Sequence, residues 1–281
     1  MERQHWIDNL KIFAMFLVIL GHLPIDSYYE SYIYVFHVPL FFCASGFLYK
    51  KIPFKDELKK CFSRLLIPYF CFQLLMCVIL YKDAETLWRN LFGILIAENY
   101  RTEYFASPCI PLWFVAALVI IRLFRSVTGK VGVALCFVLA IILSIIFRDG
   151  IEFVWSADSA LLCLPFFYLG EILRRKGHYL HYKSWLYALV LVVLLGVNVW
   201  YCALSESKVD AARFSYGNSI ILYYMYNLAM CFCMLGVFAN YVKVRIPCFT
   251  TLNEGMILVL ACHAVIGRVI MRLTPLHADI L

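Results

Sequence analysis

The first apolar segment of the sequence carries a lysine and a histidine eleven residues apart, Lys11 and His22. At about 100° and 1.5 Å per helical residue, this spacing is three turns plus roughly 20°, so both side chains share one stripe of a helix, about 16–17 Å apart. Histidine accepts a proton near neutral pH, as the deprotonation of a hydroxyl group requires. Asp8 lies three residues before Lys11 and can neutralise its charge. The pattern predicts a cation and a proton acceptor at opposite depths of one helix.

A second histidine, His37, follows the short acidic segment 24–31. Because that segment is short, His37 should lie at a depth similar to that of His22, and the two could act together near one face. Two other interpretations stay open. Lys11 could snorkel to one membrane interface while His22 sits at the other. The histidines could also form a polar pair that only packs two helices together.

The composition places these residues in a membrane protein. Hydrophobic residues make up 64% of the 281 positions and charged residues 15%, whereas soluble domains are about half apolar and a quarter charged. The apolar residues form blocks of about 16 to 22, the length that crosses a bilayer core. The charge of +7 does not indicate nucleic acid, because in a membrane protein the location of Lys and Arg says more than their total. The twelve cysteines include no Cys-x-x-Cys pair, so no metal site is predicted.

The predicted fold is an all-α, polytopic membrane helix bundle of about nine transmembrane helices, forming a single domain over residues 1–281. Short connections that are cytoplasmic if the N-terminus is cytoplasmic carry fifteen Lys and Arg, and the opposite connections carry seven, which favours this orientation. The apolar segment 87–97 is too short for a span and suits an interfacial or re-entrant helix. The expected spans are 9–24, 32–49, 62–81, 109–125, 131–147, 157–173, 184–204, 216–239 and 254–273.

These residues resemble the acyltransferase-3 family of integral membrane O-acyltransferases. The segment WIDNLKIFAMFLVILGH, with Lys11 and His22, is similar to the family's first helix, and FHVPLFFCASGFL, with His37 and Ser45, to its second. The first two motifs are closest in style to the subgroup that resembles fucose 4-O-acetylases. Further similarities lie at RLLIPY around Arg64, PLWF around Trp113, LPFFYLGEILRR around Gly170 and SYGN around Gly217.

The resemblance implies transfer of an acyl group, most often acetyl, from cytoplasmic acyl-CoA to a hydroxyl of a cell-surface or lipid-linked sugar, by a multi-pass protein of the plasma membrane. Acyl-CoA is expected as a co-substrate rather than as a bound cofactor. Lys11 and Arg64 would hold its phosphates, with Asp8 fixing Lys11, although Arg64 also fits a topology signal. His22 would act as general base or carry the acyl group briefly, while His37 orients the acceptor or His22.

Three further residues are candidates for contact with the acceptor or for support of the site: Ser45, Trp113 and His263. Ser45 could donate a hydrogen bond to the thioester carbonyl, although a small residue before Gly46 also permits close helix packing. Trp113 could stack on a sugar ring or mark the membrane interface. His263 lies about halfway along the last span, ten residues after Asn253, where the family usually has a glycine.

Members of this family commonly have ten spans, so nine could mean a short variant, an incomplete chain, or a bundle completed by a partner helix or another copy. Two other classes of function stay open. A transporter or flippase for a sugar or glycolipid would use His22, His37 and His263 as a polar path. A catalytically inactive relative would bind a glycan or a partner without releasing CoA.

Overall fold

The structure is a computed structural model that describes residues 5–23, 25–79, 83–97, 107–147, 153–181, 183–204 and 209–273. Within these ranges the chain is helical and contains no strand, apart from one isolated bridge between Asp210 and Ser215. The helices are α1 (His5–Gly21), α2 (Ser27–Tyr34), α3 (His37–Leu48), α4 (Phe54–Cys61), α5 (Ile67–Ile79), α6 (Ala84–Ile96), α7 (Trp113–Val127), α8 (Lys130–Ile146), α9 (Ala157–Arg175), α10 (Ser184–Leu204), α11 (Ile220–Tyr241), α12 (Pro247–Glu254) and α13 (Met256–Leu273).

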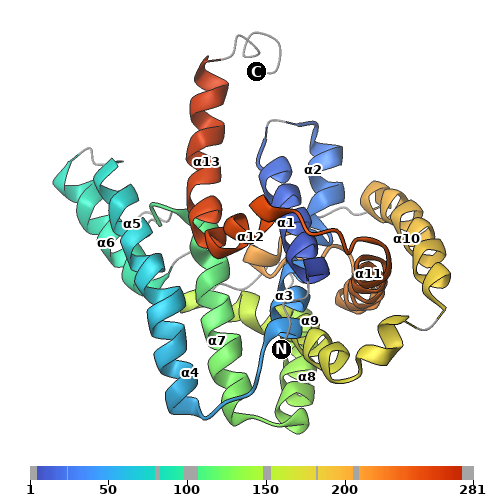
Figure 1. Ribbon diagram of the computed structural model, residues 1–281. Helices are drawn as coiled ribbons and strands as arrows, with labels where there is room; N and C mark the ends of the chain where they lie inside the picture. Colours follow the sequence, from blue (N-terminus) through green and yellow to red (C-terminus); the bar gives the residue numbers. More distant parts are fainter. Residues whose placement is uncertain are drawn as a thin grey trace.

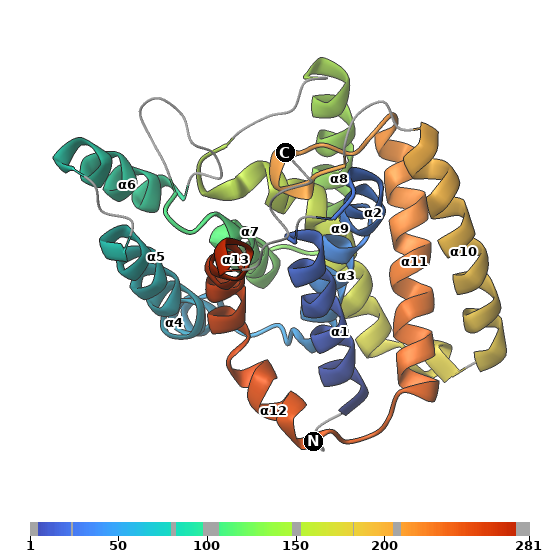
Figure 2. The ribbon, with the colours of Figure 1, turned by 90° about the horizontal axis from the view of Figure 1, so that it is seen from above.

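The all-α, polytopic bundle predicted from the sequence is confirmed. Among the described residues, six helical stretches are long and apolar enough to cross a membrane, and α8 is a shorter apolar helix. Each of the nine predicted spans coincides with a helix, but the number of crossings, the cytoplasmic N-terminus and the single domain over 1–281 stay predictions. The 13-residue helix α6 covers most of the segment 87–97 and lies beside α5 on one flank, opposite α10 and α11 (Figures 1 and 2).

One predicted connection is helical in the structure. The sequence predicts an outer loop over residues 24–31, but α2 begins at Ser27, because the Asp26 side chain accepts a hydrogen bond from the Tyr28 backbone amide and caps the helix. The chain then turns at Val35 and Phe36 and continues as α3. This turn places His37 at the first position of α3, although the stretch Ser27–Leu48 as a whole is long and apolar enough to cross a membrane.

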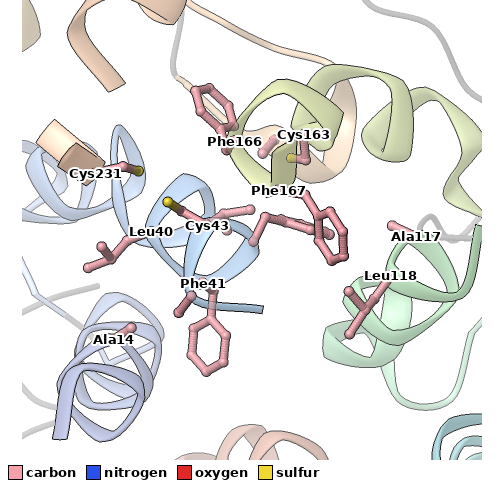
Figure 3. Close-up of a cluster of buried hydrophobic side chains, with 14 of the residues drawn as sticks. Ala14, Leu40, Phe41, Cys43, Ala117, Leu118, Cys163, Phe166, Phe167 and Cys231 are labelled. Carbon is pink, nitrogen blue, oxygen red and sulfur yellow. The ribbon is translucent and has the colours of Figure 1, made fainter. Parts of the chain in front are cut away.

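Helix α3 occupies the centre of the bundle. Its side chains Leu40, Phe41 and Cys43 lie among residues of α1, α7, α9 and α11 (Figure 3). Ten of its twelve residues are buried, which explains why its sequence is apolar all round instead of amphipathic. Because α3 contacts helices on every side, its position determines where the neighbouring helices can lie.

Two glycines let α3 and α9 approach closely. A methyl group at Gly46 would overlap the backbone carbonyl of Phe167, and one at Gly170 would overlap the carbonyl of Cys43. Close backbone approach at small residues is the usual way in which membrane helices gain packing energy without a hydrophobic driving force. The small-residue packing considered for Ser45-Gly46 is therefore carried by Gly46.

The polar ends of the helices are also tied together. Glu171 on α9 accepts hydrogen bonds from Arg125 on α7 at 2.8 and 3.0 Å and from Arg175 at 3.0 Å. Arg174 donates to the carbonyls of Leu48 and Tyr49 at the end of α3, where helix carbonyls lack intrahelical partners. These arginines therefore link α3, α7 and α9 at one end of the bundle. This structural role is separate from any effect of their charge on membrane topology.

The C-terminal helices close on the N-terminal one. Asn9 of α1 donates hydrogen bonds of 2.9 Å to the carbonyls of Val242 and Val244, which follow α11. Asn253 of α12 donates to the Asp8 carbonyl at 3.0 Å. These contacts place α13, which follows α12, alongside α1.

Candidate functional site

A cavity of about 820 Å³ lies between α1, α3, the α4–α5 segment, α7 and the α12–α13 segment. Its lining changes in character along its length. One part, here called the basic end, is lined by Lys11, Lys60, Arg64 and Arg122. The part called the histidine end is lined by His22, Tyr34, His37, Asp210 and Arg213. Since Lys11 and His22 are eleven residues apart on one helix, the two ends are separated by about 16 Å.

At the basic end, Arg122 is oriented by a buried carboxylate. Its Nε donates to Glu57 Oε1 at 2.6 Å, and the Glu57 side chain is fully buried. The Arg122 guanidinium also lies 5.6 Å from the centre of the Tyr49 ring. Its Nη2 atom is buried with no hydrogen-bond partner among the described residues, and the Arg122 side chain forms part of the cavity wall.

At the histidine end, four rings are in contact. The centres of the His22 and His263 rings are 4.8 Å apart and meet edge to face. Tyr34 lies 6.0 Å from His22 and 5.0 Å from His37. His22 is exposed to the cavity, whereas His37 and His263 are buried, at 3% and 7% exposure. The two predicted histidines therefore belong to one cluster, joined by His263 and Tyr34.

The hydrogen bonds of the histidines determine which ring nitrogen can act as a base. In each case Nδ1 is bonded to a backbone carbonyl: His22 to Val18 at 2.8 Å, and His37 to Ile33 at 2.9 Å. His263 is bonded in the same way to Leu260 at 2.7 Å. A carbonyl only accepts, so a neutral ring must carry its proton on Nδ1. The Nε2 lone pair of each ring is then left as a proton acceptor.

The structure brings six of the eight predicted site residues to the cavity wall. They are Lys11, His22, His37, Ser45, Arg64 and Trp113. His263 lies behind His22 instead, in contact with its ring. Asp8 is buried on α1 with its carbonyl bonded to Asn253. The functional roles assigned to these residues from the sequence stay predictions.

Sequence reasoning missed several residues of the cavity wall. Arg122 was counted only among the cytoplasmic positive charges, and Lys60 likewise. Tyr34 was placed inside a predicted span without a role. The sequence pattern gives Arg213 a part only as a positive charge of an outer connection, and it gives Asp210 none. A signal existed for Arg122, since an arginine at the end of an apolar block needs a carboxylate partner, but its partner Glu57 is 65 residues away.

Between the two ends the wall is apolar and aromatic. It includes Met15, Val18, Phe41, Phe114 and Leu118. The Phe41 and Phe114 rings pack edge to face with their centres 5.3 Å apart. An apolar passage between a cationic end and a proton-accepting end suits a long molecule that has an anionic head and an uncharged arm.

A bundle of apolar helices around such a cavity is the architecture of a multi-pass membrane protein. The family model described as "Acyltransferase domain", that of the acyltransferase-3 family, matches residues 4–280. The chain therefore belongs to the acyltransferase-3 family and is a membrane acyltransferase. No curated protein and no solved structure matches the chain significantly. The likeness to the fucose 4-O-acetylase subgroup stays a prediction.

Proposed function

We propose that the protein is a plasma-membrane O-acyltransferase that moves an acetyl group from cytoplasmic acetyl-CoA to a hydroxyl of a cell-surface or lipid-linked sugar. The observation that carries this proposal is the polarity of the cavity, with cations at one end and histidines with free Nε2 lone pairs at the other. The expected partners are acyl-CoA, the sugar acceptor and the bilayer. A partner helix or a second copy that completes the bundle is part of the same proposal.

The donor would enter at the basic end. Lys11, Arg64, Lys60 and Arg122 offer charge-assisted hydrogen bonds to the phosphates of CoA, and such bonds are about twice as strong as neutral ones. The pantetheine arm would follow the apolar passage along α1, with its thioester near His22. Ser45 on the wall of α3 could donate a hydrogen bond to the thioester carbonyl.

At the histidine end, His22 Nε2 would accept the proton of the sugar hydroxyl as the oxygen attacks the thioester carbon. The new C–O bond forms and the C–S bond breaks, and the proton held by His22 passes to the departing thiolate, which gives CoA and the sugar ester. His37 and His263 would orient the acceptor and the His22 ring, and Trp113 would stack on the sugar. Transfer through a short-lived acyl-His22 is the other route consistent with these positions.

The test is acyl transfer by the purified protein, supplied with labelled acetyl-CoA and a panel of free and lipid-linked sugars. His22→Ala should lower kcat by roughly 10²–10⁴-fold, the usual contribution of a general base. Binding of acetyl-CoA should be retained, because the change lies about 16 Å from the basic end. Arg64→Gln should do the reverse, raising the KM for acetyl-CoA with little change in kcat.

Three results would contradict the proposal. If the native protein does not bind acetyl-CoA, then acetyl-CoA is not the acyl donor. Uptake of a sugar into vesicles without acetyl-CoA would favour a transporter instead. Transfer that persists unchanged in a folded His22→Ala variant would remove His22 from the reaction.

A further inference from the structure

The segment from Val209 to Ser219 forms a small folded loop at the histidine end of the cavity. Asp210 and Ser215 pair through two backbone hydrogen bonds of 3.0 Å. The intervening residues form a single 3₁₀ turn, which Asp210 Oδ1 caps by accepting from the Ala212 amide at 3.0 Å. Phe214 closes the turn in the left-handed region, at φ 52°. These bonds close the segment into a compact turn.

This loop is fixed to the bundle at four points. The Phe214 side chain is fully buried. Ser159 of α9 donates to the Ala212 carbonyl at 3.2 Å, and Tyr201 of α10 donates to the Tyr216 carbonyl at 2.7 Å. Tyr216 in turn donates to the Ser144 carbonyl of α8 at 2.9 Å. Contacts with α8, α9 and α10 thus hold the loop in place. A loop that only connected two spans would not require such contacts.

The fixed loop presents a carboxylate and a guanidinium to the cavity. Asp210, Ala212 and Arg213 all contribute to its wall. Arg213 Nε lies 3.4 Å from Asp210 Oδ2, with side chains 60% and 22% exposed. Their charges act on the Tyr34 hydroxyl, and Tyr34 contacts both His22 and His37. Tyr34 therefore links the Asp210–Arg213 pair to His22, the proposed catalytic base.

The charges at this end are balanced or slightly acidic. Asp210 is offset by Arg213, and the carboxylate of Glu30 on α2 also acts on Tyr34. The basic end differs, because its four lining cations outnumber the carboxylates of Glu254 on the wall and of Glu57 and Asp8 nearby. An anionic ligand would be favoured at the basic end and disfavoured at the histidine end.

We infer that Asp210 and Arg213 form a recognition site for an uncharged polyhydroxylated acceptor, a neutral sugar, next to the hydroxyl that is acylated. A carboxylate accepts and a guanidinium donates two hydrogen bonds in a plane, and together they match neighbouring hydroxyls without selecting a net charge. This inference rests on the proposed function for the reacting hydroxyl, but binding of the sugar can be measured without turnover.

The experiment measures binding of methyl glycosides of neutral hexoses and deoxyhexoses, and of the matching uronic acids, to the detergent-solubilised protein by saturation-transfer NMR. Asp210→Asn keeps the oxygen that caps the 3₁₀ turn and removes only the charge, so the loop should stay folded. Loss of a charge-assisted hydrogen bond should weaken the binding of neutral sugars roughly 10-fold to 100-fold. The KM for the acceptor should rise by the same factor of roughly 10 to 100, and the KM for acetyl-CoA should not change.

Asp83→Asn is the matched control, because Asp83 caps α6, where asparagine caps equally well, and does not line the cavity. Arg213→Gln is the second variant, and its thermal unfolding should match that of the native protein since the Arg213 side chain is 60% exposed.

Several results would overturn the inference: no sugar of the panel bound, uronic acids bound more tightly than neutral sugars, or affinity unchanged in both variants. Sugar binding that depends on Asp210, without any acyl transfer, would count against the proposed function and leave the recognition site standing. Acyl transfer with an unchanged acceptor KM in both variants would support the proposed function and count against the recognition site.

Discussion

Glu171 lies between two arginines that differ in their surroundings. Arg125 is 3% exposed and also donates to the carbonyls of Thr128 and Gly129, whereas Arg175 is 53% exposed. A buried ion pair is a poor source of net stability, because both charges lose their hydration. Removal of one partner is nevertheless harmful, since the other charge is then left buried and uncompensated.

Glu171→Gln is therefore expected to lower the free energy of unfolding by about 3–5 kcal/mol. Arg175→Gln removes only the exposed partner of the same carboxylate and should lower it by less than about 1 kcal/mol. Thermal unfolding of both variants in one detergent, compared with the native protein, checks the difference. Equal shifts in the two variants would show that burial does not determine the effect of this cluster.

At the residue scale, the sequence predicted which side chains are candidates but not how they are held. The apolar surroundings of Lys11, His22 and His37 marked them as residues that need an explanation. Sequence spacing could not predict that Glu57 orients Arg122, because the two are 65 residues apart. It also could not predict which ring nitrogen of each histidine is bonded, because this depends on the local rotamer.

At the scale of elements, the contact between α3 and α9 depends on two glycines. The carbonyl of each helix occupies the space that a side chain would take on the other, at Gly46 and at Gly170. Since the obstacle is backbone rather than a flexible side chain, a methyl group at either position can be accommodated only if the helices separate. Separation would displace α3, which carries His37 and Ser45.

Gly170→Ala is accordingly expected to destabilise the protein by at least the roughly 1–3 kcal/mol typical of overpacking, and to reduce the yield of monodisperse protein. Gly196→Ala on α10 is the control, because nothing lies within 4 Å of the added methyl group there. Size-exclusion chromatography and thermal unfolding in detergent measure both variants. A native-like Gly170→Ala protein would mean that the two helices are less closely packed than described.

The helices themselves were predictable because each span is a long apolar block between charged connections. The break between α2 and α3 was not, since the apolar pattern continues through Val35 and Phe36. The fold of the loop from Val209 to Ser219 was also missed, because its anchors Ser144, Ser159 and Tyr201 come from three separate spans. The local pattern of apolar residues predicts where the helices lie in the sequence. The contacts that fold this loop depend on how those helices pack against each other.

At the scale of the whole molecule, the cavity has two chemically different ends about 16 Å apart. The predicted topology places the basic end at the cytoplasmic face and the histidine end at the opposite face. The donor and acceptor would then approach the same cavity from different sides of the membrane. The orientation itself is predicted from the distribution of Lys and Arg over the connections.

Cysteine labelling tests that orientation. Cys248 on α12 is exposed, near the basic end. In a Cys71→Ser background, a membrane-impermeant maleimide should label Cys248 in inside-out vesicles but not in right-side-out vesicles. A cysteine introduced by Ser27→Cys, at the start of α2 near the histidine end, should show the reverse. Labelling of both positions from one side would contradict the topology.

The hydrogen bonds between α1 and the chain around α12 have a consequence for biogenesis. Helix α1 leaves the ribosome before α12, and the carbonyls that accept from Asn9 belong to residues 233 and 235 positions later. Until those residues are made, the Asn9 amide must find water, lipid headgroups or a temporary protein partner. His263 also meets His22 only after synthesis of α13, so the histidine cluster cannot form on a chain that has been made only as far as α12.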